Sequence, residues 1–563
     1  MTVEHLGWAA IALYALLTRL AALGLRPLNT IEASQALFAR DMASKGLSLI
    51  ASEPRASGWI DPLRAGVTML LGASDYGTRI IAAMFGLMLI GSAFAMRRRL
   101  GRAGALAFAT MLTLSPTLTY FSRSASASVP AIALVVFAIA LMFSIPGGSD
   151  TLKVAGVAIM IALALSAETI AVPILVMFLA ILLVMGLFEL FRPRPMLRMR
   201  VWWERRSAQL IFCIAIAVGV FVVFESGLGR RNLLLPMIFG AMQQWVPITH
   251  PDLRGGLDFY LPALAFYEFG ILIAAVVGAL AFVTLQLRTR IAAVAFLWTL
   301  FSAAFFFADP WRRPDWLVMM IVPAALLAAA VIDRLHRTEL WSIVRYPILG
   351  LALLTIYVQL ATNFVHAAPD PSEPPAAHHM LLYWSDPATT MIAEQELDHD
   401  ARTVTYRGSV FFDQSNPVAR WYLRDLKPAD SAANADLVIS ASSAEKESTL
   451  LQTYDFTLDE KWRPSLSNLT PAAAMGYFFT QRAWSEVTGN EIRADLKAPA
   501  TPTPPAPSPV ATPSTSATPT AEVSVTPTPT AEPTASATAA PTAAPTPVPP
   551  SAATTAPSAS ASP

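Results

Sequence analysis

Long apolar runs, separated by charged residues, proline or glycine, are the feature that most constrains this chain. About eleven of them approach the roughly 20 residues that cross the hydrocarbon core of a bilayer as a helix. They begin near Leu6, Gly77, Ala103, Ser128, Val154, Ile170, Leu210, Phe259, Ile291, Trp316 and Tyr346. Because lipid offers no hydrogen-bond partner, every amide must be satisfied within its own segment. The sequence therefore predicts an all-α polytopic membrane bundle of about 11 transmembrane helices.

The basic residues are distributed unevenly between the loops that join these runs. With a cytoplasmic N-terminus, the inner loops hold sixteen arginines and lysines, whereas the short outer loops hold six. Inner loops of membrane proteins carry such an excess of basic residues. We therefore predict a multi-pass protein of the cell membrane with a cytoplasmic N-terminus. An odd number of spans places the C-terminal part outside the cytoplasm.

The apolar runs occupy residues 1–365, which we interpret as a transmembrane domain with a long first outer loop at residues 25–63. Within this loop a helix is predicted to start near Asn29 and to end before Gly46. Outer loops of this length are usually functional. The loop is therefore the first place to look for a site.

After the last run, residues 376–495 alternate short β-rich stretches, Thr403–Tyr406 and Leu437–Ser440, with the helical stretch Ala388–Leu397. This pattern predicts a small extracytoplasmic α/β domain. Residues 496–563 consist almost entirely of Pro, Thr, Ala and Ser, and 18 of the 44 prolines lie beyond residue 498. Such a composition cannot bury a core, which predicts a disordered stalk.

Charge and cysteine content exclude several classes of function. The net charge of +1 comes from 40 basic and 39 acidic residues, a balance that does not indicate a nucleic-acid partner. The single cysteine, Cys213, lies in an apolar run. An intrachain disulfide, a cysteine-based zinc site and an iron–sulfur cluster are therefore excluded.

In the first outer loop, Glu32, Ala36 and Arg40 share one face of the predicted helix. One interpretation makes Glu32 a general base or metal-coordinating carboxylate at the membrane surface, with Arg40 as a substrate-binding cation on the same stripe. The other makes Asn29 and Glu32 a capping box, with the Glu32 carboxylate accepting from the first amide of the helix. The sequence leaves both interpretations open.

The stretch Leu25–Ala33 resembles the first-loop motif of the C-class integral-membrane glycosyltransferases, and most closely a prokaryotic branch named for association with flippase activity. Further stretches resemble the same branch in the same order along residues 1–495. They are Leu100–Ala105, Leu114–Arg123, Ala167–Thr169, Arg254–Gly256 with Tyr260 and Tyr267–Glu268, Arg313–Leu317 and Trp421–Asp425.

The resemblance implies an inverting transfer of a sugar from a polyprenyl-phosphate donor on the outer face of the membrane. Such a reaction needs a carboxylate near the acceptor and a cation for the leaving phosphate. Glu32 occupies the position of the family's first-loop acid. The partners implied are a polyprenyl-phosphate-linked sugar and membrane lipid, with cell-envelope assembly proteins as candidate partners of the C-terminal domain. A divalent cation, Mg²⁺ or Mn²⁺, is the candidate cofactor.

Two further carboxylates lie in or beside the apolar runs. Glu168 lies in a short turn between two runs. It is interpreted either as a second candidate catalytic residue or as a solvated residue at the tip of a hairpin. Glu268 lies deeper, and it is interpreted either as a substrate-binding residue or as a structural polar contact that could pair with Arg254.

The remaining candidate substrate-binding residues are cations of the outer loops: Arg123, Arg254, Arg312 and Arg313. A guanidinium can bind a phosphate through two parallel hydrogen bonds. Arg123 can equally anchor a helix end at the membrane interface, and the other arginines can be solvated loop charges.

The sequence also departs from the family pattern, because Ile31 stands where a second acid is usual. Two functions therefore stay open. The first is a membrane glycosyltransferase with hexosyl or mannosyl specificity. The second is a catalytically degenerate relative that binds the lipid carrier or acts as a flippase-associated assembly protein.

Overall fold

The computed structural model describes residues 2–24, 28–52, 59–144, 151–167, 171–190, 195–226, 257–284, 289–308, 314–365, 409–411, 417–422, 424, 427–431, 435, 437–441, 450–462, 470–472, 475 and 487–497. Its contacts divide the chain into two units, Met1–Pro499 and Ala500–Pro563. The predicted stalk beyond Lys497 lies outside the described residues.

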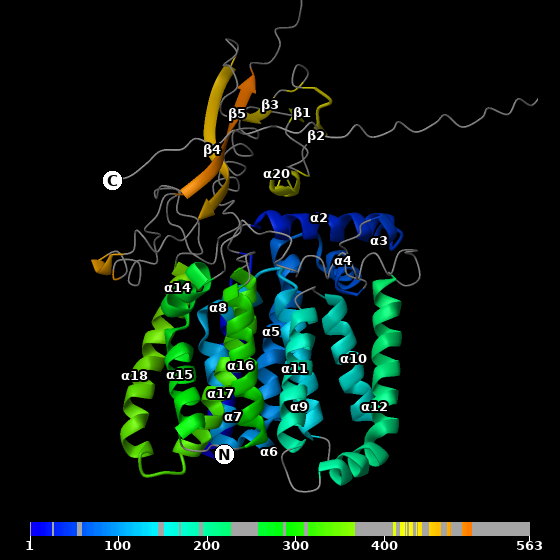
Figure 1. Cartoon of the computed structure of the whole chain (residues 1–563). Helices are drawn as coiled ribbons and strands as arrows, with labels where there is room; N and C mark the ends of the chain where they lie inside the picture. Colours follow the sequence, from blue (N-terminus) through cyan, green and yellow to red (C-terminus); the bar gives the residue numbers. More distant parts are fainter. Residues whose placement is uncertain are drawn as a thin grey trace, which may run out of the picture. The chain divides into compact units, whose positions relative to one another are not determined.

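Most of the described residues form helices that run side by side in one bundle (Figure 1). Each of the predicted apolar runs coincides with a helix or with a pair of consecutive helices. The helices are α1 (Val3–Leu20), α5 (Asp75–Ala95), α7 (Arg102–Leu114), α9 (Ser128–Ser144), α10 (Thr151–Ala167), α11 (Ala171–Leu190), α12 (Pro195–Glu225), α14 (Leu257–Tyr267), α15 (Phe269–Thr284), α16 (Arg290–Ala308), α17 (Leu317–Leu335) and α18 (Trp341–Leu360).

Six helices of the described chain are long and apolar enough to cross a membrane, and the bent pair α14 and α15 makes a seventh if it forms one span. The helices α7, α9 and α10 are apolar but shorter. The chain is thus a mostly helical protein with several membrane-spanning segments, and the count of eleven spans stays a prediction.

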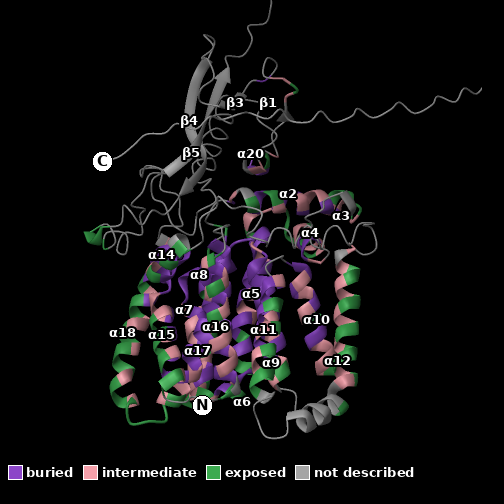
Figure 2. Cartoon of the chain, in the orientation of Figure 1, coloured by how far each residue is buried: buried purple, intermediate pink, exposed green. Residues whose placement is uncertain are grey.

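The core of the bundle is centred on α17. In its candidate span, Pro314–Leu335, 89% of the most apolar window is buried, whereas only 17% is buried in the span that contains α18. Figure 2 shows the same contrast, with buried residues on α17 and exposed residues on α18. Exposed apolar side chains such as Leu353 fit a lipid-facing helix.

The predicted first outer loop and the residues that directly follow it form α2 (Thr30–Lys45), α3 (Leu49–Ser52) and α4 (Ile60–Leu71), at the end of the bundle opposite the N-terminus (Figure 1). Asn29 is the N-cap of α2, and Gly46 ends the helix with φ +84°, a conformation that glycine adopts without a steric penalty. The predicted helix from Asn29 to before Gly46 is confirmed.

Two interruptions of the bundle matter for the site. The short helices α6 (Arg97–Leu100) and α8 (Pro116–Ser122) flank α7, and Ser115 caps α8 through its hydroxyl, which accepts from the Leu118 amide. The run that begins near Phe259 is bent by 103° between α14 and α15, with Glu268 at the break.

The helix α17 is preceded by a 3₁₀ turn, η2 (Pro314–Trp316), and α18 is followed by a π-helix, η3 (Ala361–Val365). The single turn η2 places Asp315 at the start of the most buried helix of the bundle. It therefore brings a carboxylate to the end of the bundle core.

The C-terminal part contains the short helix α20 (Pro417–Tyr422) and one five-stranded sheet. Its strand order is β2-β1-β3-β5-β4, in which β1 pairs in parallel with β2 and β3, and β5 pairs antiparallel with β3 and β4. The strands are β1 (Ser409–Phe411), β2 (Lys427–Pro428), β3 (Leu437–Ala441), β4 (Leu450–Trp462) and β5 (Val487–Lys497).

The strand β3 coincides with the predicted strand Leu437–Ser440. The predicted strand Thr403–Tyr406 and the predicted helix Ala388–Leu397 lie outside the described residues. The boundaries of the predicted α/β domain stay a prediction.

Candidate functional site

Glu32 contacts several elements at the end of the bundle opposite the N-terminus, which is the end predicted to face outward. The Asn29 side chain accepts from the amides of Ile31 and Glu32, and the Glu32 Oε2 atom accepts from the Asn29 amide at 3.1 Å. The capping box that the sequence allowed is therefore present.

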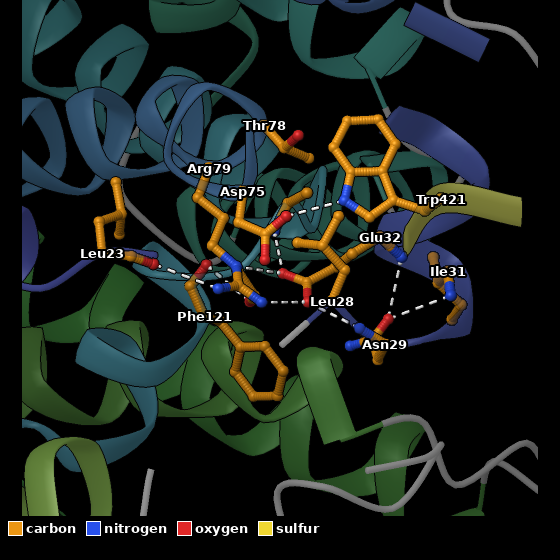
Figure 3. A network of polar contacts seen from close by, with 12 residues as sticks. Leu23, Leu28, Asn29, Ile31, Glu32, Asp75, Thr78, Arg79, Phe121 and Trp421 are labelled. Carbon is orange, nitrogen blue, oxygen red and sulfur yellow. Dashed lines mark hydrogen bonds and ion pairs between the residues drawn. The ribbon is translucent and has the colours of Figure 1, made fainter. Parts of the chain in front are cut away.

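The same carboxylate also makes a buried ion pair with Arg79 of α5 (Figure 3). Arg79 Nε lies 3.0 Å from Glu32 Oε1, and Arg79 Nη2 lies 2.8 Å from Glu32 Oε2. The side chains of Arg79 and Glu32 are 0% and 3% exposed. Two parallel charge-assisted hydrogen bonds fix the position of α2 relative to α5.

The Glu32 carboxylate also contacts the loop that joins α8 to α9. The loop between α8 and α9 spans Arg123–Ala127, and the Ala125 amide donates to Glu32 Oε1 at 2.7 Å. The Ala125 carbonyl accepts from Arg64 Nη2 of α4 at 2.6 Å, and Arg64 forms a buried ion pair with Asp61 at 2.9 Å. Ala125 is thus held from both sides by charged residues of the first outer loop.

A further carboxylate reaches the same loop from η2. The Asp315 Oδ2 atom accepts from the Ser126 hydroxyl at 3.3 Å and from the Ser128 hydroxyl at 2.5 Å. Asp315 is 5% exposed. We define the loop Arg123–Ala127 with Glu32, Asp61, Arg64, Arg79 and Asp315 as the outer-end site.

Arg123 lies at the start of this loop, but its guanidinium points to α1. Arg123 Nη1 donates to the carbonyls of Thr18 and Ala21 at 3.0 and 2.6 Å, and Nη2 donates to the Ala22 carbonyl at 2.8 Å. The last carbonyls of a helix have no partner within the helix. The structure therefore gives Arg123 the helix-anchoring contacts that the sequence left open, and its phosphate-binding role stays a prediction.

Glu268 makes the polar contact that was the structural interpretation of this residue. Its Oε1 atom accepts from the Ser115 hydroxyl at 2.6 Å and from the Thr117 amide at 2.9 Å, both at the N-terminus of α8. Among the described residues its Oε2 atom has no hydrogen-bond partner. The bend between α14 and α15 thus brings a carboxylate against the first turn of α8.

The other predicted site residues are only partly placed. Arg40 is half-buried on α2, two turns after Glu32. Glu168, Arg254, Arg312 and Arg313 lie outside the described residues. Their predicted roles stay predictions.

No group of three or more His, Cys, Asp or Glu side chains gathers among the described residues. Glu32 and Asp61 are bonded to arginines, and Asp315 accepts from serine hydroxyls. A hard divalent cation prefers several converging oxygen ligands. These carboxylates therefore do not fit a Mg²⁺ or Mn²⁺ site in the arrangement that the structure describes.

The C-terminal part contributes to the same region through α20. Trp421 Nε1 donates to Asp75 Oδ1 at 2.8 Å, and the Tyr422 hydroxyl donates to Asp75 Oδ2 at 2.9 Å. Asp75 is the first residue of α5 and precedes Arg79 by one turn. Figure 3 shows Trp421 and Asp75 beside the Glu32–Arg79 pair.

The sequence reasoning missed Asp61, Arg64 and Arg79, and it quoted Asp315 only as part of a motif. Arg79 had a detectable signal, because a charged residue within an apolar run is costly unless it is paired. Asp61 and Arg64 are three residues apart, the spacing of an ion pair on one helix face. The partner of Arg79, 47 residues away, could not be read from spacing.

In the arrangement that the structure describes, the hydrogen-bonding capacity of the Glu32 carboxylate is saturated by protein donors. The hydrogen bonds from Asn29, Arg79 and Ala125 to Glu32 already fill the roughly four lone-pair sites of a carboxylate. For Glu32 to accept a proton from a substrate, one protein donor has to move away. The Ala125 amide belongs to a loop and is the contact that can change with the least disturbance of the helices.

No protein-family model matches the chain, and no curated protein matches it. Among solved structures, it is similar to the crystal structure of ArnT from Cupriavidus metallidurans bound to undecaprenyl phosphate, with a TM-score of 0.49 and 17% identity, over 75% of this chain and 85% of that chain. The apo structure of the same protein gives a TM-score of 0.49 and 15% identity over the same shares. At identities this low, the roles of the residues follow from the contacts of this chain itself.

Proposed function

We propose that the chain is a membrane glycosyltransferase that transfers a sugar from a polyprenyl-phosphate donor to an acceptor at the outer face of the membrane. One observation carries the proposal. Four stretches that resemble the C-class glycosyltransferases in sequence, around Glu32, Arg123, Asp315 and Trp421, are far apart in the chain but lie at one end of the bundle. Independent structural roles would not require them to converge.

In this proposal the acceptor hydroxyl loses its proton to a carboxylate as its oxygen attacks the anomeric carbon. The bond between that carbon and the phosphate oxygen breaks, and polyprenyl phosphate leaves with the bonding electrons. Glu32 is the predicted base, Glu168 is the second candidate catalytic residue, and Asp315 is a further buried carboxylate at this end of the bundle. Arg123, Arg254, Arg312 and Arg313 are the candidate cations for the leaving phosphate, with Arg40 and Glu268 as further substrate-binding candidates.

The test uses the full chain in lipid nanodiscs with radiolabelled polyprenyl-phosphate sugars and a membrane extract as the source of acceptor. We expect label to leave the lipid-linked pool, and we expect Asp315→Asn, Glu32→Gln or Glu168→Gln to reduce the rate at least about 100-fold per folded molecule if that residue is the base. The control is Lys45→Met, since Lys45 is 62% exposed and lies outside the outer-end site. No transfer from any donor of a hexose and aminosugar panel would contradict the proposal.

A second candidate function is favoured by the saturation of Glu32 and by the use of Arg123 for helix anchoring. A degenerate relative that only binds the lipid carrier could keep these contacts and lack a base. It predicts photocrosslinking of a polyprenyl-phosphate probe to the chain without turnover. Detectable transfer by the purified wild-type chain rules it out.

A further inference from the structure

The helix α20 docks on the first outer loop through a small apolar cluster. Its members are Leu28, Ala33, Ala36, Leu37, Trp421 and Tyr422. Trp421 and Tyr422 are 1% and 8% exposed, although α20 is only six residues long. A helix this short is not stable by itself. Its position therefore depends on what Trp421 and Tyr422 contact.

The Tyr422 hydroxyl joins two helices. It donates to Asp75 Oδ2 at 2.9 Å and accepts from the Leu28 amide at 2.7 Å. Burial raises the pKa of the Tyr422 phenol, and the neighbouring Asp75 carboxylate raises it further. The phenol is therefore protonated at neutral pH and can make both hydrogen bonds.

Trp421 and Arg424 complete the docking. Trp421 Nε1 donates to the second oxygen of Asp75, so both carboxylate oxygens are bonded to α20. The Arg424 guanidinium lies over the Trp421 ring, 4.3 Å from its centroid, and donates to the Ala73 carbonyl at 3.1 Å. These contacts tie α20 to the residues that immediately precede α5.

The Leu28 amide and the Asp75 carboxylate, which α20 contacts, lie at the starts of the two helices that carry the buried ion pair. Leu28 directly precedes Asn29, whose amide donates to Glu32, and Asp75 begins the helix that carries Arg79 one turn later. One phenolic hydroxyl thus links the start of α2 to the start of α5.

We infer that Trp421 and Tyr422 are positioning residues for the outer-end site. Docked α20 holds α2 and α5 at the spacing in which Glu32 and Arg79 meet, and undocking loosens the ion pair and the loop at Ala125 that depends on it. The segment that follows the membrane bundle thereby controls the site. The functional arm of this inference rests on the proposed glycosyl transfer, whereas the docking arm does not.

Docking can be measured by thiol accessibility. Cys213→Ser removes the only cysteine of the chain, and Ala33→Cys then places a single thiol inside the cluster, where Ala33 is 0% exposed. In Tyr422→Phe, Asp75 loses a donor and the Leu28 amide loses its acceptor. We expect the labelling rate with a membrane-impermeant maleimide to rise about 10- to 100-fold.

The matched control is Tyr76→Phe, because Tyr76 follows Asp75 on α5 and is 42% exposed. It also removes one phenolic hydroxyl, but from a half-exposed tyrosine of α5 itself, and labelling should change less than about twofold. If Ala33→Cys itself prevents docking, Ala36→Cys reports on the same cluster, since Ala36 is 2% exposed. Equal labelling rates in Tyr422→Phe and Tyr76→Phe at both positions overturn the inference.

The functional arm separates positioning from simple stability. We expect Tyr422→Phe to lower the kcat of sugar transfer at least about tenfold while the KM for the lipid-linked donor stays within about twofold, because none of the candidate substrate-binding residues lies on α20. Faster labelling with unchanged kcat overturns the positioning role. If the wild-type chain shows no transfer, the proposed function fails, and the labelling rates alone decide whether α20 docks as described.

Discussion

The buried ion pair between Arg79 and Glu32 gives the sharpest quantitative prediction. Arg79→Met removes both hydrogen bonds to the carboxylate and the bond from Arg79 Nη1 to the Leu23 carbonyl at 3.2 Å. Because both side chains are almost fully buried, the carboxylate is left without a counter-charge. Removing one partner of such a pair costs about 3–5 kcal/mol.

Two companion variants provide a comparison for this predicted loss of stability. Arg79→Lys keeps the charge but loses the two-point geometry, which predicts a loss of about 1.5–3 kcal/mol. Lys45→Met breaks the exposed i,i+4 pair with Asp41, whose N–O distance is 3.3 Å, and should cost less than about 0.5 kcal/mol. The three variants thus separate burial from the mere presence of an ion pair.

The assay is equilibrium unfolding of the detergent-solubilised full chain. Unfolding is monitored by the labelling of a single cysteine introduced on α5 in the Cys213→Ser background. The expected order of destabilisation is Arg79→Met, then Arg79→Lys, then Lys45→Met. If Arg79→Met and Lys45→Met were equally stable, the ion pair would contribute nothing measurable and the reasoning would be wrong.

Substitutions at three other positions test further contacts, at Glu32 and Arg123 by the same unfolding measurement and at Gly101 by the folded yield. Glu32→Gln should cost about 2–4 kcal/mol, because in either orientation its NH2 group faces an Arg79 N–H together with the amide of Ala125 or of Asn29, and wild-type stability would contradict the saturated arrangement. Arg123→Met should cost about 2–3 kcal/mol through the lost carbonyl contacts at the end of α1, with partial recovery in Arg123→Lys, and equal values for the two would contradict a role for the charge. Gly101→Ala should lower the folded yield severely, since its φ is +82° and a Cβ there would collide with Asp333, whereas Gly91→Ala, with open space around it, should fold normally.

Much of the membrane bundle could be predicted, because the physics of lipid acts on each segment separately. An apolar run of sufficient length becomes a helix whatever its neighbours are, so every predicted run coincides with helical structure. The bend at Glu268 was missed for the opposite reason. It depends on α8, whose first turn the Glu268 carboxylate contacts, and α8 is distant in sequence.

The first-loop helix was predictable because its caps are local. Asn29 and Glu32 are three residues apart, and Gly46 follows the last residue of α2, so short stretches of sequence determine both ends of the helix. The ion pair with Arg79 is not local, and nothing in the spacing of Glu32, Ala36 and Arg40 indicates it. The sequence therefore located Glu32 but not its partner.

Some of the family-like motifs have structural explanations in this chain. The stretch Leu100–Ala105 contains Gly101 and Gly104, where α7 packs so closely against α17 that a side chain would meet Asp333 or the Ala329 carbonyl. That motif reflects helix packing rather than chemistry. The motif at Trp421 is different, because the side chains of Trp421 and Tyr422 both donate a hydrogen bond to one carboxylate, Asp75, at the edge of the site.

Two of the carboxylates in the outer-end site are paired with arginines. Glu32 is balanced by Arg79, and Asp61 is balanced by Arg64, and both pairs hold the same residue, Ala125, through its amide and its carbonyl. Displacement of Ala125 removes one of the donors to Glu32, and it also releases the bond from Arg64 to the Ala125 carbonyl. Displacement of this one residue would therefore leave Glu32 with one donor fewer and Arg64 with one acceptor fewer, and a carboxylate and a cation are the two groups that transfer from a phosphate-linked sugar requires. Because α20 fixes the starts of α2 and α5, the same displacement is coupled to whether α20 is docked.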